Sequence, residues 1–277
     1  MIEGYRVIDM HTHAFPDAIA ERTVAYLAER GGMTPEGNGT VEALMTRMRE
    51  SGVSLAINLP VVTKPSQYRS VNDFAAALNA AGEGIASFGG IHPESEDIEG
   101  ELDGIVSRGL RGIKLHPDYQ GVRIDDPRFI SVVRAALSRG LHIVTHTGLD
   151  VAYPDDVHAM PSATARLLDA LGDISAYGRG RLILAHLGGI FPSEAELRRH
   201  IVGRDVLLDL AYIVRHLAPE QLCSLIRLHG TDRVVFGSDY PWSDPAADVR
   251  ALIRSGLTET ELRAVLSGNA ERLLATP

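Results

Sequence analysis

The sequence predicts an α/β protein built as a single (β/α)8 barrel, and three observations support this. Eight short apolar runs alternate with longer amphipathic segments along the 277-residue chain, as expected when a helix follows each barrel strand. Several runs are apolar almost throughout, which is typical of parallel strands buried on both faces. Histidines and an aspartate end several of these runs, at the end of the strand where barrel enzymes place their active sites.

The expected strands are short and rich in branched apolar residues. They cover residues 5–10, 53–59, 84–91, 110–115, 141–146, 181–186, 206–211 and 233–238. The expected helices are longer and repeat their apolar residues with the period of a helix. They cover residues 17–30, 41–51, 71–81, 97–108, 127–139, 161–171, 193–200, 218–229 and 246–254, followed by a C-terminal helix over 258–274. Taken alone, this alternation also fits a doubly wound open sheet.

We expect one domain over residues 1–277, because the sequence has no linker, low-complexity tract or change of composition. Hydrophobic residues make up 45% of the chain, which is enough for one large core. Two loops, residues 31–40 and 60–70, are rich in glycine, proline and polar residues. They follow the first two expected strands or their helices, so we expect them to cover the barrel mouth.

The composition also limits the classes of molecule that we expect the protein to bind. The net charge of −9 and the lack of a basic stripe argue against nucleic acid and anionic membranes. The single cysteine, Cys223, excludes an intrachain disulfide and a thiolate metal cluster. The sequence has no run of about 18 apolar residues, the length that is needed to cross a membrane. Its first residues also lack the pattern of a secretory signal. We expect a cytoplasmic protein with a small-molecule substrate. The sequence is compatible with a monomer and with a homo-oligomer.

Six of the eleven histidines lie at ends of the expected strands. The polar residues at these ends are His11 and His13 after the first strand, His92 after the third, Lys114 and His116 on the fourth, His146 after the fifth, His186 after the sixth and Asp239 after the eighth. Residues i and i+2 of a strand point to the same side. We therefore expect the pair on the first strand, and likewise the pair on the fourth, to face the barrel axis.

Neutral imidazoles and a carboxylate are the ligands of a catalytic zinc or a related divalent ion. Such a site keeps one position open for water, whose pKa falls from about 15.7 towards 7 on the metal. Lys114 has two interpretations at this place. It is either carbamylated and bridges two metals, or it remains an ammonium that binds a substrate carboxylate.

The motifs resemble those of the amidohydrolase superfamily. They are His11-x-His13, His146, the sequence HLGG from His186 and the sequence GSDYP around Asp239. The stretches GIKLHP and FGSDYPW are more specifically similar to the amidohydrolase-related branch, which includes aminocarboxymuconate semialdehyde decarboxylase and γ-resorcylate decarboxylase. The resemblance runs from residue 9 to residue 242, and it implies a metal-bearing (β/α)8 barrel.

The resemblance implies a role for each matching residue. His11, His13 and His146 are implied to be metal ligands, with Asp239 as the fourth ligand and as the catalytic base. His186 is implied to act as an acid, a base or a polarising group, or to bind a second metal. Lys114 stands where two-metal members carry a carbamylated lysine. The implied cofactor is one divalent metal, Zn²⁺ with Mn²⁺ as the alternative, and a second metal stays open.

Further residues near strand ends are candidates for substrate contacts. His116 matches no firm family role, and His92 lies in a Gly-x-His-Pro sequence that resembles TatD-type deoxyribonucleases, although the acidic chain argues against nucleic acid. Tyr119, Tyr240 and Trp242 follow the fourth and eighth strands. In a chain with 5% aromatic residues, we expect some of them to line an apolar pocket.

Two reactions fit these residues. The first is metal-dependent hydrolysis of a C–N or C–O bond in an amide, lactone or ester, in which metal-bound hydroxide attacks the carbonyl carbon, Asp239 moves the proton and His186 stabilises the developing charge. The second is non-oxidative decarboxylation or hydration of an unsaturated or aromatic acid, in which Asp239 or His186 protonates the carbon. Release of carbon dioxide would distinguish the decarboxylation from the hydrolysis. Phosphoester hydrolysis and a non-catalytic binding protein are further alternatives.

Overall fold

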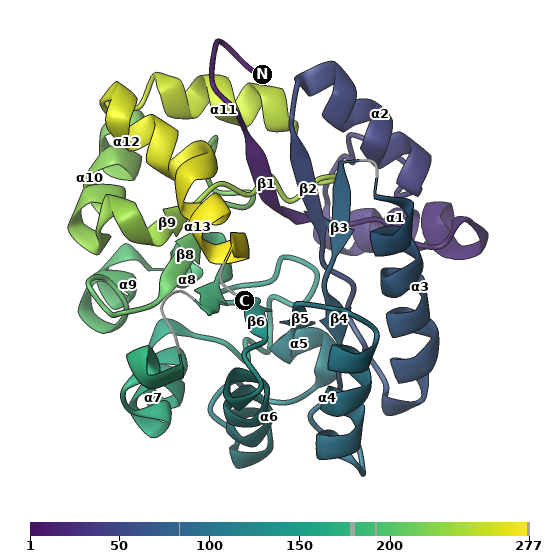
Figure 1. Cartoon of the computed structure of the whole chain (residues 1–277). Coiled ribbons are helices and arrows are strands. Elements are labelled where there is room, and N and C mark those ends of the chain that lie inside the picture. The colour runs from purple at the N-terminus through teal and green to yellow at the C-terminus, as the bar shows by residue number, and fades with distance from the viewer. Residues whose placement is uncertain (83, 178–180, 192, 276–277) are drawn as a thin grey trace.

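Short parallel strands form a ring at the centre of the computed structural model, which describes residues 1–82, 84–177, 181–191 and 193–275 (Figure 1). Within these residues the strands are β1 (Ile8–Thr12), β2 (Leu55–Asn58), β3 (Ile85–Ser87), β4 (Gly89–Gly90), β5 (Gly112–Leu115), β6 (His142–Thr145), β7 (Leu182–Leu184), β8 (Leu207–Asp209) and β9 (Val234–Val235). The hydrogen-bonded pairs of neighbouring strands within these residues are all parallel. The predicted α/β fold class and its parallel strands are confirmed.

The third expected strand, residues 84–91, is divided at Phe88 into β3 and β4. β3 pairs with β2, and β4 pairs with β5. The two strands therefore form one position of the barrel between β2 and β5. The ring closes between β1 and the segment after β9, because Met10 donates its N–H to Phe236 O (2.9 Å) and Asp239 donates its N–H to His11 O (2.8 Å). The described strands thus form the predicted eight-membered ring.

The helices surround this ring (Figure 1). The outer helices are α1 (Asp17–Gly31), α2 (Val41–Ser51), α3 (Tyr68–Ala81), α4 (Ile98–Ser107), α6 (Pro127–Ser138), α7 (Pro161–Leu171), α9 (Glu194–His200), α10 (Pro219–His229) and α11 (Pro245–Ile253). Several begin where the sequence supplies a cap, as at Thr40, whose hydroxyl accepts the N–H of Ala43. Two short helices, α5 (Pro117–Gln120) and α8 (Ala185–Gly189), follow β5 and β7 closely.

The expected C-terminal helix, residues 258–274, is interrupted. It consists of α12 (Glu259–Arg263), a π-helical turn over Ala264–Gly268 and α13 (Asn269–Ala275). Ala270 and Leu273 of α13 belong to the same buried cluster as Ile8, Met10 and other side chains inside the barrel. The last helix therefore helps to close one end of the barrel, and the polar strand ends lie at the other.

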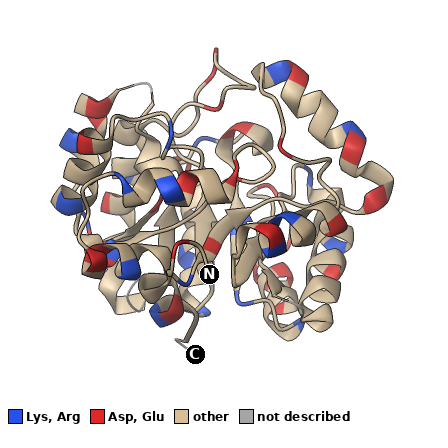
Figure 2. Ribbon diagram, turned by 90° about the horizontal axis from the view of Figure 1, so that it is seen from above, with Lys and Arg blue, Asp and Glu red and all other residues tan. Residues whose placement is uncertain are grey.

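Acidic and basic residues are interspersed on the helices seen in Figure 2. Some form ion pairs one turn apart, such as Arg198 with Glu194 and Arg263 with Glu259. Exposed pairs of this kind contribute at most about 1 kcal/mol to stability. In the part of the chain that the structure describes, every helix is too short or too polar to span a bilayer.

Candidate functional site

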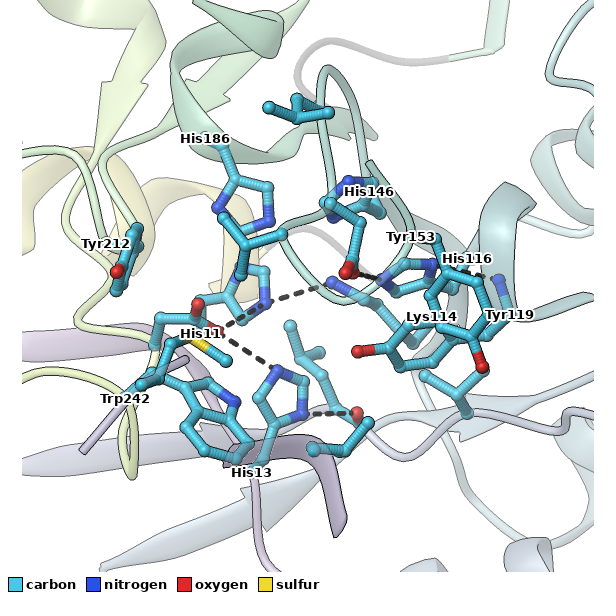
Figure 3. A pocket seen from close by; sticks show the side chains of 18 of the residues that line it. His11, His13, Lys114, His116, Tyr119, His146, Tyr153, His186, Tyr212 and Trp242 are labelled. Atoms are coloured by element: carbon cyan, nitrogen blue, oxygen red, sulfur yellow. Dashed lines mark hydrogen bonds and ion pairs between the residues drawn. The ribbon is translucent and has the colours of Figure 1, made fainter. Parts of the chain in front are cut away.

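A cavity of about 640 Å³ opens at the carboxyl ends of the strands, within the range typical of small-molecule sites. Its lining gathers polar side chains from distant parts of the sequence (Figure 3). They include His11, His13, Lys114, His116, His146, Asp150, His186 and Asp239. The ring of strands thus places most of the expected site residues around one space.

The first cluster of potential metal ligands consists of His11, His13 and Asp239. Their ligand atoms all lie within 4.8 Å of one another. Asp239 Oδ1 is 3.4 Å from His11 Nε2 and 3.2 Å from His13 Nε2. We call these three residues the inner triad.

An irregularity in β1 helps to direct His11 into the cavity. The pairing register with β2 shifts between Asp9 and Thr12. Ile8 and Met10 pack in the buried inner cluster, whereas His11 lines the cavity. The buried Asp9 carboxylate stabilises this arrangement, because its Oδ1 accepts the N–H groups of His11 (3.2 Å) and of Ser238 (2.9 Å), the residue before Asp239.

The groups behind the two imidazoles determine their tautomers. His11 Nδ1 lies 2.7 Å from Asp209 Oδ2, and His13 Nδ1 lies 3.0 Å from the carbonyl oxygen of Leu59. Both oxygens accept, so each Nδ1 carries the hydrogen and each Nε2 presents a lone pair. Burial lowers the pKa of His11 well below its usual range, which keeps the ring neutral.

This donor set fits a divalent cation. Two imidazole lone pairs converge on one carboxylate oxygen, and acceptor atoms that face each other need a proton or a cation between them. Burial acts to raise the pKa of Asp239, but His13 and the other histidines beside it lower the pKa below its ordinary value, so the carboxylate stays ionised. Nitrogen and oxygen donors of this kind suit zinc and related ions.

Lys114 reaches the inner triad from β5. Its Nζ lies 2.9 Å from His11 Nε2, and its side chain is almost completely buried. Burial lowers the pKa of Lys114 to about 8, so the neutral amine is accessible close to neutral pH. As an amine it donates to His11, and an ammonium at this place would compete with a metal for the same lone pair.

A second cluster consists of His116, His146 and Asp150, whose ligand atoms also lie within 4.8 Å of one another. The expected ligand set placed His146 with the inner triad, and the structure instead places it here. The reason is its position directly after β6, the neighbour of β5, where its ring stacks on that of His116 at 4.1 Å. His116 Nδ1 accepts the N–H of Tyr119 (3.4 Å), so its Nε2 carries the hydrogen that faces Asp150 Oδ2 at 3.2 Å.

His186 lies between the two clusters. Its ring centroid is 5.3 Å from that of His11 and 4.7 Å from that of His146. Its Nδ1 is 3.0 Å from the carbonyl oxygen of Ala211, and its backbone N–H donates to Asp209 Oδ1 at 2.9 Å. The same tautomer argument leaves the lone pair of its Nε2 free to accept a proton or to bind a cation.

The backbone is strained around this cavity. Among the described residues, five that are not glycine have a positive φ. Three of them line the cavity: His186 (φ 56°), Tyr212 (φ 65°) and Asp239 (φ 70°). Such conformations cost roughly 1–3 kcal/mol each and concentrate at functional sites, so their position here supports a functional role for the cavity.

Two of the expected substrate contacts lie outside the cavity, which is lined by Tyr119 and Trp242 but not by His92 or Tyr240. His92 is buried, and its Nδ1 accepts the N–H of Glu94. Tyr240 packs in an apolar cluster with Ala14, Leu44 and other residues, because its positive-φ neighbour turns the chain at Asp239. His92 and Tyr240 therefore lie apart from the residues that line the cavity.

Sequence reasoning missed three aspartates of the site. Asp209 lies within an expected apolar strand, and a charged residue inside such a run is a signal in itself. Asp150 follows His146 in a loop, and Asp118 follows His116. Asp118 Oδ2 is buried 3.8 Å from His146 Nε2, and neither atom has a hydrogen-bond partner among the described residues.

Comparisons with known proteins agree with this fold. A family model described as amidohydrolase matches residues 8–276. No curated protein sequence matches the chain. An uncharacterised TIM-barrel protein from Bordetella bronchiseptica has a TM-score of 0.73 at 17% identity, covering 98% of both chains.

Two structures with functional descriptions are also similar. A probable 2-pyrone-4,6-dicarboxylic acid hydrolase from Acinetobacter baumannii has a TM-score of 0.67 at 15% identity, with 97% of this chain and 98% of the other covered. A 2,6-dihydroxybenzoate decarboxylase from Rhizobium has a TM-score of 0.69 at 16% identity, with the same coverage. At such identities these likenesses show the fold alone. The family model covers nearly the whole chain, and the chain therefore belongs to the amidohydrolase family, as its motifs predict.

Proposed function

We propose that the protein is a metal-dependent hydrolase that cleaves a C–N or C–O bond of a small amide, lactone or ester, with Zn²⁺ as its metal and Mn²⁺ as the alternative. The inner triad carries this proposal, because the lone pairs of His11 Nε2 and His13 Nε2 converge on Asp239 Oδ1. The family is consistent with it. A bound divalent cation would polarise a carbonyl, acidify a water or anchor a carboxylate.

Asp239 of the inner triad and the neighbouring His186 would carry out the proton transfers. Asp239 is ionised at neutral pH because its pKa is held low, so it can take a proton and later return it to a leaving group. His186 has its Nδ1 hydrogen engaged by Ala211 O. Its Nε2 would therefore accept a proton, after which the imidazolium would stabilise negative charge on the substrate.

Lys114 would have one of its two expected roles. Lys114 Nζ lies 2.9 Å from His11 Nε2, so a carbamate on this side chain could share a metal with the triad, and a second ion would then bind His146 and His186. An unmodified Lys114 would instead hold a substrate carboxylate inside the buried end of the cavity. Metal content separates the two, since a bridge requires two ions per chain.

A non-oxidative decarboxylase is the second candidate, and the cavity wall favours it in one respect. The rings of Tyr119, His116 and His146 line the cavity and stack with centroid separations of 3.7 and 4.1 Å, and an aromatic acid would find further aromatic groups to contact there. A decarboxylase of 2,6-dihydroxybenzoate shares the fold. In this reaction Asp239 or His186 would protonate the carbon that loses carbon dioxide.

Metal analysis and a product test decide between these functions. The purified protein, supplied with zinc or manganese, is expected to hold one or two divalent ions per chain. A screen of lactones, amides, esters and aromatic acids in ¹⁸O-labelled water is expected to give a labelled acid. Release of carbon dioxide, with no label in the organic product, would indicate the decarboxylase. Failure to bind either metal would contradict both proposed functions.

A further inference from the structure

Most of the charged and histidine side chains of the cavity lie at one end. Its polar end holds the inner triad, the second cluster and Lys114, as described above. The remaining lining is mainly apolar and comes from α1, from the loop that follows it and from the segments after β2, β6, β7, β8 and β9. Leu27, Met33, Leu149, Ile213 and Trp242 are examples.

The mouth of the cavity exposes further apolar side chains. Six large hydrophobic residues are exposed among the described residues, and three of them line this cavity: Tyr26 (52%), Val151 (38%) and Phe191 (37%). Exposed apolar groups gathered at a concave site mark a binding surface. Their concentration at one opening shows that the apolar lining continues from the interior to the rim.

This rim is fixed by hydrogen bonds between its segments. Leu149 donates its N–H to Phe191 O at 3.0 Å, which joins the loop after β6 to the segment after α8. Arg30 donates from Nε to Ala152 O at 3.0 Å and stacks on the ring of Tyr153 at 4.5 Å, which joins that loop to α1. The apolar surface is therefore held in place by contacts that involve all three segments.

Cationic groups are scarce in the apolar half. Among the described residues the lining contains two lysines and no arginine. Lys114 lies at the polar end beside His11, and Lys64 is exposed. A second carboxylate on a substrate would lose its hydration in the apolar half without gaining an ion pair there.

We propose that the substrate has one polar or anionic end, where the reaction takes place, and a substantial apolar body that fills the outer cavity and reaches the rim. This inference rests on the proposed function for the identity of the reacting end. It goes beyond that function because it excludes compact di- and tricarboxylates as preferred substrates.

Binding of simple acids tests the inference without turnover. The zinc-loaded protein is titrated calorimetrically with butanoate, hexanoate and octanoate, and with hexanedioate and octanedioate. The dissociation constant of the monoacids is expected to fall by up to about fourfold for each methylene buried. The second carboxylate is expected to weaken binding at least tenfold at equal length. Affinity independent of chain length, tighter binding of the diacids, or no binding of any acid would overturn the inference.

Two matched variants locate the effect. Val151→Ser removes an apolar contact at the rim and is expected to weaken octanoate binding about threefold to tenfold. Val106→Ser changes a somewhat more exposed valine (46%) on α4 that does not line the cavity, and octanoate is expected to bind this variant as it binds the native protein. Equal losses in both variants would contradict the assignment. So would a stable dimer that dissociates in Val151→Ser, because a second copy would then cover the rim.

The outcomes for the two proposals are separate. A protein that prefers long monoacids but turns over no ester, lactone or amide would retain this inference and lose the proposed hydrolysis. A protein that hydrolyses such substrates but prefers short diacids would do the reverse.

Discussion

Replacement of Asp209 by asparagine should weaken metal binding more than it weakens the fold. Asp209 Oδ2 accepts the Nδ1 hydrogen of His11 at 2.7 Å, and Oδ1 accepts the backbone N–H groups of His186 (2.9 Å) and Ala211 (3.1 Å). Both side chains of the His11–Asp209 pair are almost completely buried. Asparagine has the same shape and can keep the backbone contacts, so the change mainly removes the negative charge behind His11.

The size of the effect follows from this geometry. A carboxylate that accepts the second ring hydrogen of a metal-ligating histidine fixes its tautomer and makes the other nitrogen more basic, and its loss typically costs 10- to 100-fold in metal affinity. An amide that turns its NH₂ towards His11 would even favour the wrong tautomer, with the hydrogen on Nε2. Burial raises the pKa of Asp209, so removal of its charge is not expected to destabilise the metal-free fold strongly.

The assay is a competition between the protein and a zinc chelator at pH 7.5, combined with thermal unfolding of the metal-free protein. Asp209→Asn is expected to have a zinc dissociation constant 10- to 100-fold above the native value. Asp126→Asn, a matched change at the start of α6 where the side chain accepts the N–H of Arg128, is expected to leave zinc affinity unchanged. If Asp209→Asn folds and binds zinc within twofold of the native protein, the role assigned to the pair is wrong.

Three further predictions concern the same cavity. Asp239→Asn should lower turnover by at least about 100-fold with an unchanged circular dichroism spectrum, and near-native activity would exclude Asp239 as the base. Removal of the metal with a chelator should abolish turnover, and zinc or manganese should restore it; activity that persists in metal-free protein would reject the metal. Burial lowers the pKa of the Lys114 amine from 10.5 to about 8, so the unfolded chain binds the proton on this amine more tightly than the folded chain does. The free energy of unfolding should therefore rise as the pH increases from about 8 to 10.5. The free energy of unfolding of the metal-free protein should rise by about 3 kcal/mol over that window relative to Lys114→Met, and parallel pH profiles of the two proteins would contradict this.

The fold could be predicted because each element has a local signal. Branched apolar runs marked the strands, and helical periodicity marked the helices within a few residues of their observed bounds. The exceptions depend on contacts between distant segments. The strand expected over 84–91 is divided at Phe88 because its two halves pair with different neighbours, and the C-terminal helix contains a π-helical turn.

The candidate site could be predicted only in part. Periodicity and motif spacing pointed to His11, His13 and Asp239, which converge, and they also pointed to His92 and Tyr240, which do not line the cavity. A strand-end position says which end of the barrel a residue occupies. It does not say whether the side chain points inward, because a bulge in β1 and positive φ values at Asp239 and His186 change the direction of individual side chains.

The oxygen atoms that accept the ring hydrogens of the histidines determine the chemistry of the site, and motifs in the sequence do not identify them. Asp209 on β8 faces His11 on β1, Leu59 after β2 faces His13, and Ala211 after β8 faces His186. Each of these oxygens accepts a ring hydrogen and leaves one lone pair for the cavity. The three partners, Asp209, Leu59 and Ala211, belong to no catalytic motif of their own, so the metal-binding form of the site depends on packing between strands as much as on the histidines that the sequence displays.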